Sequence, residues 1–233
     1  MSTEPVLRLE NLQFGYDPKE VLIHIEEFEI SPGESVFLKG PSGSGKSTLL
    51  GLIGGVLTPQ LGELSICGTE LTNISSAQRD KVRADRLGII FQQFNLLPYI
   101  GITQNCILPC RFSSRRRDRA IAAGGSVVSA AEMLIRGLGL TDDQLSRSVG
   151  KLSVGQQQRV AVARALIGGP DLIIADEPTS ALDHDNRDRF IELLNLSREQ
   201  FGSALLFVSH DQTLATYFDR SVSLTDLNQK VPI

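Results

Sequence analysis

The sequence has few cysteines and no pattern that would cross-link the fold. Its three cysteines, Cys67, Cys106 and Cys110, cannot all pair with one another, so no disulfide framework is implied and a reducing compartment is favoured. Cys106 and Cys110 could form half of a metal site, but the other ligands that such a site needs do not accompany them. A chain of 233 residues is long enough to be stabilised by a hydrophobic core alone.

Long apolar runs and an excess of positive charge are absent as well. The longest apolar stretch, residues 49–57, has about half of the ~20 residues that a membrane-spanning helix needs. The first residues, MSTEPVLRLE, contain no apolar segment of the kind that secretion signals have. The net charge of -4 argues against a general nucleic-acid-binding protein, which would be basic. We expect a protein that is soluble or peripheral to a membrane and that has no nucleic-acid partner.

One segment is locally basic. Five arginines lie between Arg111 and Arg119. Such a run could bind nucleic acid or lipid headgroups, but in an otherwise acidic protein a solvated loop is the favoured interpretation.

The order of the apolar segments predicts an α/β fold. Residues 6–38 mix apolar and polar positions like half-buried strands, and the segments SVFLKG, RLGIIFQ, LIIA and LLFVS read as buried strands. Buried strands separated by helices are typical of a parallel sheet that is covered on both faces. We predict a single domain over residues 1–233, with a core at about 1–95 and 156–233 and a helical insertion at about 96–155.

A glycine-rich segment matches a phosphate-binding loop. GPSGSGKST has the spacing G-x-x-x-x-G-K-[ST], follows a predicted strand and precedes a predicted helix. Its backbone N–H groups can turn toward a phosphate, Lys46 supplies a positive charge to the β- and γ-phosphates, and Ser47 offers a hydroxyl to Mg²⁺. The candidate phosphate-binding residues are Gly40, Pro41, Ser42, Gly43, Ser44, Gly45, Lys46, Ser47 and Thr48.

Two acidic residues end the predicted strand in LIIADE. Burying carboxylates for structure alone is unfavourable, whereas a site for Mg²⁺ and a nucleotide at the carboxyl end of the strand explains both. We expect Asp176 to hold Mg²⁺ and Glu177 to polarise the attacking water. His210 follows the strand LLFVS at the same edge and is interpreted as a contact to the γ-phosphate. His24, in the early strand region, is interpreted as structural.

The phosphate-binding loop alone does not specify the class of enzyme, because small kinases and GTPases share it. A GTPase would carry a guanine-selective Asn-Lys-x-Asp segment, which this sequence lacks. A kinase would need an acceptor pocket, which a sequence does not reveal. The kinase interpretation is therefore still open at this point.

A second candidate phosphate-binding segment, KLSVGQQQRVAVARAL, covers residues 151–166. Ser153 and Gln156 have the spacing of a capping box, which starts a helix. The N-terminus of a helix attracts anions through its unpaired N–H groups and its dipole. The sequence thus contains two separate segments that suit a phosphate.

The second segment resembles the signature motif of the ATP-binding cassette (ABC) ATPases, and that family's other motifs occur in the family's order. Tyr16 in FGY lies where the family stacks an aromatic ring on adenine, and Gln92 in FQQFNLLP resembles the Q-loop glutamine. SALD, Ser180 to Asp183, resembles the D-loop, and His210 matches the switch histidine. The resemblance extends over residues 6–215, nearly the whole chain.

The resemblance implies a fold, an activity and a partner. The fold is a P-loop NTPase core with a mainly parallel sheet, an N-terminal antiparallel β subdomain and a helical subdomain that ends in the signature motif. The activity is Mg²⁺-dependent ATP hydrolysis, in which Gln92 acts both in catalysis and as a metal ligand. The partner is a second copy packed head to tail, so Ser153 and Gly155 would bind the γ-phosphate of a nucleotide seated on that partner. Gln156 and Asp183 are implied to belong to the same nucleotide site.

One residue departs from the family's usual signature, which has glycine where this chain has Val154. Valine resists a positive φ but accepts a helical φ. The fit therefore requires residue 154 to belong to the first turn of the helix.

The motif text is most similar to the small cassettes of the lipoprotein-releasing and macrolide-exporter group. The resemblance implies an integral membrane permease as a second partner and a peripheral location on the cytoplasmic face of the inner membrane. The segment GITQNCILPC, which faces the permease in the family, departs from the family's usual text. The alternative is a soluble ABC ATPase that acts on ribosomes or DNA without a permease, although the second cassette or long coiled coil of such proteins is not found in this sequence.

Overall fold

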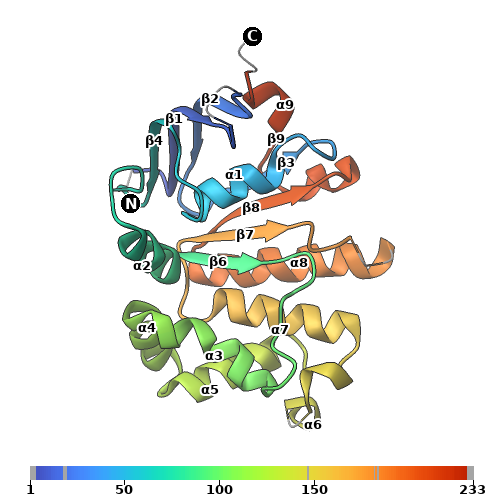
Figure 1. Ribbon diagram of the computed structural model, residues 1–233. Helices are drawn as coiled ribbons and strands as arrows, with labels where there is room; N and C mark the ends of the chain where they lie inside the picture. Colours follow the sequence, from blue (N-terminus) through green and yellow to red (C-terminus); the bar gives the residue numbers. More distant parts are fainter. Residues whose placement is uncertain (1–3, 18–19, 146, 181, 183, 230–233) are drawn as a thin grey trace.

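The computed structural model describes residues 4–17, 20–145, 147–180, 182 and 184–229, and its fold is built on two β-sheets. One sheet is antiparallel with the strand order β2-β1-β4-β5, and the other is parallel with the order β6-β7-β8-β3-β9. Figure 1 shows the antiparallel sheet at one end of the molecule, the parallel sheet in the middle and a group of helices at the other end. Within these residues, no helix is long and apolar enough to span a membrane.

The central strands of the parallel sheet form from short apolar runs that are buried on both faces. β3 pairs with β8 so that Lys39 lies opposite Ser209, and β7 pairs with β8 so that Asp176 lies opposite Val208. The carboxyl ends of these strands therefore meet at one edge, which is where ligands bind in open α/β sheets. The strands are β3 (Ser35–Lys39), β6 (Leu87–Ile90), β7 (Leu172–Asp176), β8 (Ala204–Ser209) and β9 (Arg220–Ser223).

The antiparallel sheet alternates buried and more exposed residues, as a sheet with one covered face requires. Its buried side chains share a core with Leu49, Leu52 and Ile53 of helix α1 (Lys46–Ile53) and with β3. Helix α1 thus lies between the two sheets (Figure 1). The strands are β1 (Leu7–Phe14), β2 (Ile23–Ile30), β4 (Leu61–Ile66) and β5 (Thr69–Glu70).

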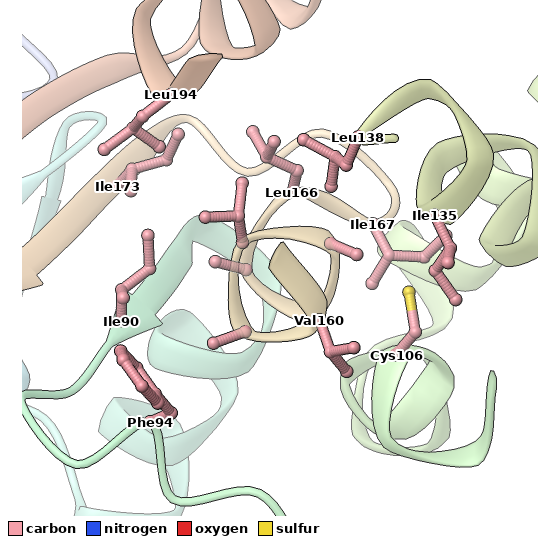
Figure 2. Packing of buried hydrophobic residues seen from close by; sticks show 14 of the residues in the cluster. Ile90, Phe94, Cys106, Ile135, Leu138, Val160, Leu166, Ile167, Ile173 and Leu194 are labelled. Carbon is pink, nitrogen blue, oxygen red and sulfur yellow. The ribbon is translucent and has the colours of Figure 1, made fainter. Parts of the chain in front are cut away.

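Helices cover the other face of the parallel sheet, and helix α7 (Val154–Leu166) lies at the centre of that layer. Figure 2 shows α7 surrounded by side chains from both its flanking helices and the sheet, among them Ile90, Cys106 and Leu194. Val160 and Leu166 of α7 are fully buried there. The neighbouring helices are α3 (Ile102–Phe112), α4 (Ser114–Gly124), α5 (Val127–Gly137), α6 (Asp142–Leu145) and α8 (His184–Phe201). The other helical elements are α2 (Ser76–Arg86), α9 (Leu224–Leu227), and the 3-10 helices η1 (Val149–Lys151) and η2 (Gln212–Tyr217).

This architecture confirms the predicted fold: a parallel α/β core, an N-terminal antiparallel sheet and an insertion of helices between β6 and β7. Cys106 and Cys110 lie on α3 as free thiols buried in the apolar core. The structure agrees with the structural interpretation of His24. Its backbone N–H donates to Asn228 Oδ1, and its ring Nδ1 lies within hydrogen-bond distance of the Gln229 carbonyl oxygen.

The prediction of a solvated loop for the basic run 111–119 is wrong. Most of the run lies in α4, and Arg116 is only 2% exposed. The Arg116 guanidinium donates to the carbonyl oxygens of Leu87, Ala165 and Ile167 at 3.0, 2.6 and 2.7 Å. Composition could not indicate this burial, because the accepting carbonyls come from β6 and the end of α7, far away in the sequence.

Candidate nucleotide-binding site

The glycine-rich loop connects β3 to α1 and presents an open helix N-terminus. Gly45 precedes α1 with a φ of 98°, and no side chain caps the helix there. The backbone angle favours glycine, and a Cβ atom at Gly45 would also lie 2.8 Å from Ile23 Cδ1, so that side chain would have to shift. The Ser44 hydroxyl is buried and has no hydrogen-bond partner among the described residues. The loop therefore offers a buried hydroxyl and unpaired N–H groups, which suit a phosphate.

Three charged or titratable side chains converge beside this loop. Lys46 Nζ donates to the carbonyl oxygens of Gly40 and Pro41 at 2.7 and 3.0 Å, and it lies 3.9 Å from Glu177 Oε1. The other carboxylate oxygen of Glu177 lies 2.8 Å from His210 Nδ1. A phosphate in the loop would be attracted by the Lys46 cation and would lie near a carboxylate that is already oriented by a histidine.

A cleft of about 490 Å³ collects the predicted residues from four separate segments. Gln92 enters it after β6, and Asp176 enters it from the end of β7. Burial, and then the negative charge of Glu177, raise the pKa of Asp176, while Lys46 opposes that shift. The cleft is lined by Leu22, Ser42, Gly43, Gly45, Lys46, Ser47, Thr48, Gln92, Asp176, Glu177 and His210.

Tyr16 lies beside the loop but is not one of the residues that line the cleft. Its ring is 71% exposed and contacts the edge of the Phe14 ring at a centroid distance of 5.1 Å. Its hydroxyl lies 3.3 Å from Thr48 Oγ1 in the first turn of α1. Tyr16 is thus tied to the phosphate loop while most of its ring stays free for stacking.

The signature segment forms the start of α7 as predicted. Ser153 and Gln156 make a capping box: the Gln156 N–H donates to Ser153 Oγ at 3.3 Å, and the Ser153 N–H donates to Gln156 Oε1 at 3.0 Å. Val154 is the first residue of the helix, which meets the requirement for a helical φ, and it is 48% exposed. A Cβ atom at Gly155 would meet nothing within 4 Å, so this surface is open.

Ser153, Gly155 and Gln156 do not line the cleft of their own chain. Figure 1 shows the start of α7 beside α6, on the far side of the parallel sheet from α1. The structure therefore brings together the loop, Asp176, Glu177, His210 and Gln92, but it leaves the signature residues apart from them. The predicted D-loop residue Asp183 lies outside the described residues.

Two features of the site were missed in the sequence. Leu22, just before β2, lines the cleft, but an apolar residue at a strand end carries no signal for such a role. Gln158 is 2% exposed and donates from Nε2 to the Pro178 carbonyl oxygen at 2.9 Å. Its amide lies on the face of α7 whose other buried residues are apolar. A polar residue at a position that the helical pattern assigns to the core was the signal that could have indicated its role.

Comparison with known proteins now identifies the family. Residues 23–180 match the family model described as ABC transporter. The chain belongs to the ABC transporter family. Among curated members of the ABC transporter family, the lipoprotein-releasing system ATP-binding protein LolD of Novosphingobium aromaticivorans is 41% identical over 226 residues, covering 95% of this chain and 97% of LolD. The macrolide export ATP-binding/permease protein MacB of Marinobacter nauticus is 35% identical over 230 residues, covering 97% of this chain and 34% of MacB.

Solved structures of ABC transporter cassettes have the same fold. The dimeric structure of the cassette MJ0796, a protein of Methanocaldococcus jannaschii, matches with a TM-score of 0.75 and 33% identity, covering 93% of both chains. Its post-hydrolysis dimer bound to ADP and Pi matches with a TM-score of 0.76 and 31% identity, covering 97% of this chain and 99% of the other. The predicted family, fold and class of activity are confirmed: this chain is an ATP-binding ATPase subunit of the ABC transporter type. The kinase interpretation is excluded.

Proposed function

We propose that two copies of this ABC ATPase pack head to tail and share two ATP molecules, each held between the loop of one copy and the start of α7 of the other. One observation carries the proposal: α7 begins with a capped, exposed N-terminus that lines no part of its own chain's cleft. A helix N-terminus is an anion site, so it suits a phosphate that a second chain supplies. The cassette MJ0796, which is similar over most of its length, has been solved as a dimer.

Each nucleotide would contact both copies. Tyr16 would stack on the adenine, and residues 40–48 would surround the phosphates. Ser153, Gly155 and Gln156 of the second copy would donate N–H and hydroxyl groups to the γ-phosphate. ATP then adds contacts across the dimer that ADP lacks, and this difference supplies a two-state switch.

Glu177 is proposed as the general base for the attacking water. Its carboxylate is only 13% exposed and lies 3.9 Å from Lys46 Nζ and 2.8 Å from His210 Nδ1. His210 would orient the carboxylate and contact the γ-phosphate, and Gln92 would help to place the water. Loss of a general base typically lowers turnover ~10²–10⁴-fold.

The residues of the cleft also fit Mg²⁺. This ion takes oxygen ligands and is commonly bound by one or two carboxylates together with substrate phosphates. The Ser47 hydroxyl, the Asp176 carboxylate and the Gln92 amide line the same cleft and supply that donor set. When bound, Mg²⁺ would neutralise charge on the phosphates.

A complementation experiment tests the shared site. Lys46→Ala disables the loop, and Ser153→Arg blocks the start of α7, so each variant alone should fail to dimerise with ATP. Mixing the two variants should restore ATP-dependent dimers in size-exclusion chromatography, because one of the two sites in a mixed dimer then combines two intact halves. A mixture that stays monomeric, while the wild-type protein dimerises, contradicts the shared site.

A second groove supports an integral membrane permease as the partner. It has a volume of about 600 Å³ and lies between α2, β6 and α3. Phe91 and Phe112, which are 39% and 76% exposed, line it together with Pro109, while Asp80 and Lys81 supply charges from α2. An aromatic groove with charged edges fits an amphipathic helix. MacB, whose name joins an ATP-binding part to a permease, supports the same pairing.

We therefore propose that the protein lies on the cytoplasmic face of the inner membrane, attached through that permease. Affinity purification from detergent-solubilised membranes should recover a protein with several membrane spans. Phe112→Glu should abolish this recovery, while Leu196→Glu, which changes an equally apolar exposed residue on α8, should preserve it. Recovery of ribosomes or DNA in place of a membrane protein would contradict the proposal that the partner is a permease.

A further inference from the structure

Helix α7 contains a buried amide one turn and a half from the residues that suit a partner's phosphate. Gln158 lies five positions after Ser153, which is about 7.5 Å along the helix axis. It is 2% exposed, within a helix whose other buried residues are apolar. A buried amide is unfavourable unless it is hydrogen-bonded, and Gln158 Nε2 meets that need by donating to the Pro178 carbonyl oxygen at 2.9 Å.

The accepting carbonyl belongs to the residue that directly follows Glu177. Glu177 has a φ of 46°, a left-handed value that a residue other than glycine rarely adopts and that needs support from its surroundings. On one side the Glu177 N–H donates to the Val208 carbonyl oxygen of β8 at 2.9 Å. On the other side the Glu177 carbonyl oxygen accepts from the Ser180 N–H at 3.2 Å, and the Pro178 carbonyl that follows accepts the bond from Gln158. The strained backbone of Glu177 is thus held between β8 and α7.

We propose that Gln158 is a positioning residue that links the start of α7 to the Glu177 carboxylate of the same chain. This inference rests on the proposed shared site and on the proposed role of Glu177. In the dimer, the start of α7 would contact the nucleotide of one site, while Glu177 serves the other site. Gln158 is therefore the connection through which the position of α7 at one ATP fixes the catalytic carboxylate at the second ATP.

The bond is suited to this task because both of its ends are constrained. Pro178 has a fixed φ, which leaves few free dihedrals between its carbonyl and the Glu177 Cα, so a displacement of that carbonyl is passed on to the backbone that carries the carboxylate. Gln158 lies at the start of the mostly buried part of α7, so its amide moves with the helix. A residue that only fills space in the core would not require a donor at this position.

Steady-state ATPase kinetics with Gln158→Met test the proposal, because methionine has a similar length and no donor. The loss of one hydrogen bond should lower kcat about two- to tenfold. The ATP concentration at half-maximal rate should stay the same, because the loop and the start of α7 are unchanged. Gln157→Met is the matched control, since the Gln157 amide donates to Leu152 and not to the segment after Glu177. A wild-type kcat in Gln158→Met would overturn the proposal, and Gln158→Asn, one methylene shorter, repeats the test if the methionine variant does not fold.

A double variant shows whether Gln158 acts through Glu177. In a Glu177→Gln background the residual turnover should not fall further when Gln158→Met is added, because the carboxylate to be positioned is gone. A further two- to tenfold loss in that background would assign Gln158 a role in packing alone and overturn the proposal. The single variant Glu177→Gln distinguishes failure of the proposed role of Glu177 from failure of the proposed role of Gln158. Normal turnover in Glu177→Gln refutes the role of Glu177. An inactive Glu177→Gln together with a fully active Gln158→Met refutes only the role of Gln158.

Discussion

Arg116 should stabilise the fold strongly, although it lies outside the nucleotide cleft. Burial lowers the pKa of this guanidinium to about 10, so it is still a cation at pH 7. Within the described residues no carboxylate pairs with it, and carbonyl oxygens of β6 and of the end of α7 accept its N–H groups. The negative end of the α7 dipole adds to this stabilisation.

The size of the effect follows from these contacts. Arg116→Met removes three hydrogen bonds of 3.0 Å or shorter, and a charged donor contributes about 1.5–3 kcal/mol in each, or about 5–9 kcal/mol in all. Removing a buried cation also relieves a desolvation cost of several kcal/mol. We expect a net loss of about 3–4 kcal/mol in the free energy of unfolding, which lowers the Tm by roughly 10 °C in a chain of this size.

Equilibrium unfolding in urea, followed by circular dichroism, measures this loss. Arg117→Met is the control, because Arg117 on the same helix is 52% exposed and lies 3.5 Å from Asp118 in a solvated ion pair. The control should change the free energy of unfolding by about 0.5 kcal/mol or less. If the two variants unfold at the same urea concentration, Arg116 does not hold α7 against β6 and the reasoning fails.

Three further predictions concern the nucleotide site. Tyr16→Ala should weaken ATP binding about tenfold or more and Tyr16→Phe should not, since base stacking contributes ~1–3 kcal/mol; equal affinities in calorimetry would place the adenine elsewhere. Burial and Glu177 raise the pKa of Asp176 above its usual 3.8, so its folded form loses stability as the pH rises through that raised value. Asp176→Asn should thus melt higher than the wild type without nucleotide at pH 7 and by a smaller margin at pH 4, and a constant margin would contradict the cause given. Val154→Gly should keep turnover within about twofold, because residue 154 is already helical; a large gain would show that the valine obstructs the partner's phosphate.

The parts of the site that were predictable from the sequence are contiguous motifs or residues that directly follow predicted strands, such as Glu177 and His210. The loop 40–48 favours glycine at positions such as Gly45, where the backbone has a positive φ, so neighbouring residues in the sequence are enough to indicate the loop. The capping box of Ser153 and Gln156 is local in the same way. Strands β3, β6, β7 and β8 of the parallel sheet were predictable because they are continuous apolar runs, which differ from the alternating pattern of the antiparallel sheet. The edge strand β9, with the sequence RSVS, has no such run and was not predicted.

The parts that were not predictable depend on which distant segments meet. Arg116 reads as one cation in a basic run, and only the packing of α4 against α7 and β6 shows that its partners are carbonyl oxygens. Gln158 reads as one of three adjacent glutamines, and only the approach of the segment after β7 supplies its acceptor. Neither partner is a side chain, so no pairing of residue types in the sequence could indicate these bonds.

Helix α7 connects the two surfaces that the proposed function requires. Its 13 residues span about 20 Å, and its first turn carries the signature residues. Its last turn reaches the groove proposed for the permease, because Arg164 and Ala165 line that groove together with Arg116. Arg164 also donates to the carbonyl oxygens of Phe94 and Asn95, just after Gln92. A permease helix that shifted the last turn of α7 would therefore move its first turn as well, because one continuous helix joins the two turns and the residues between them are mostly buried in close-packed core.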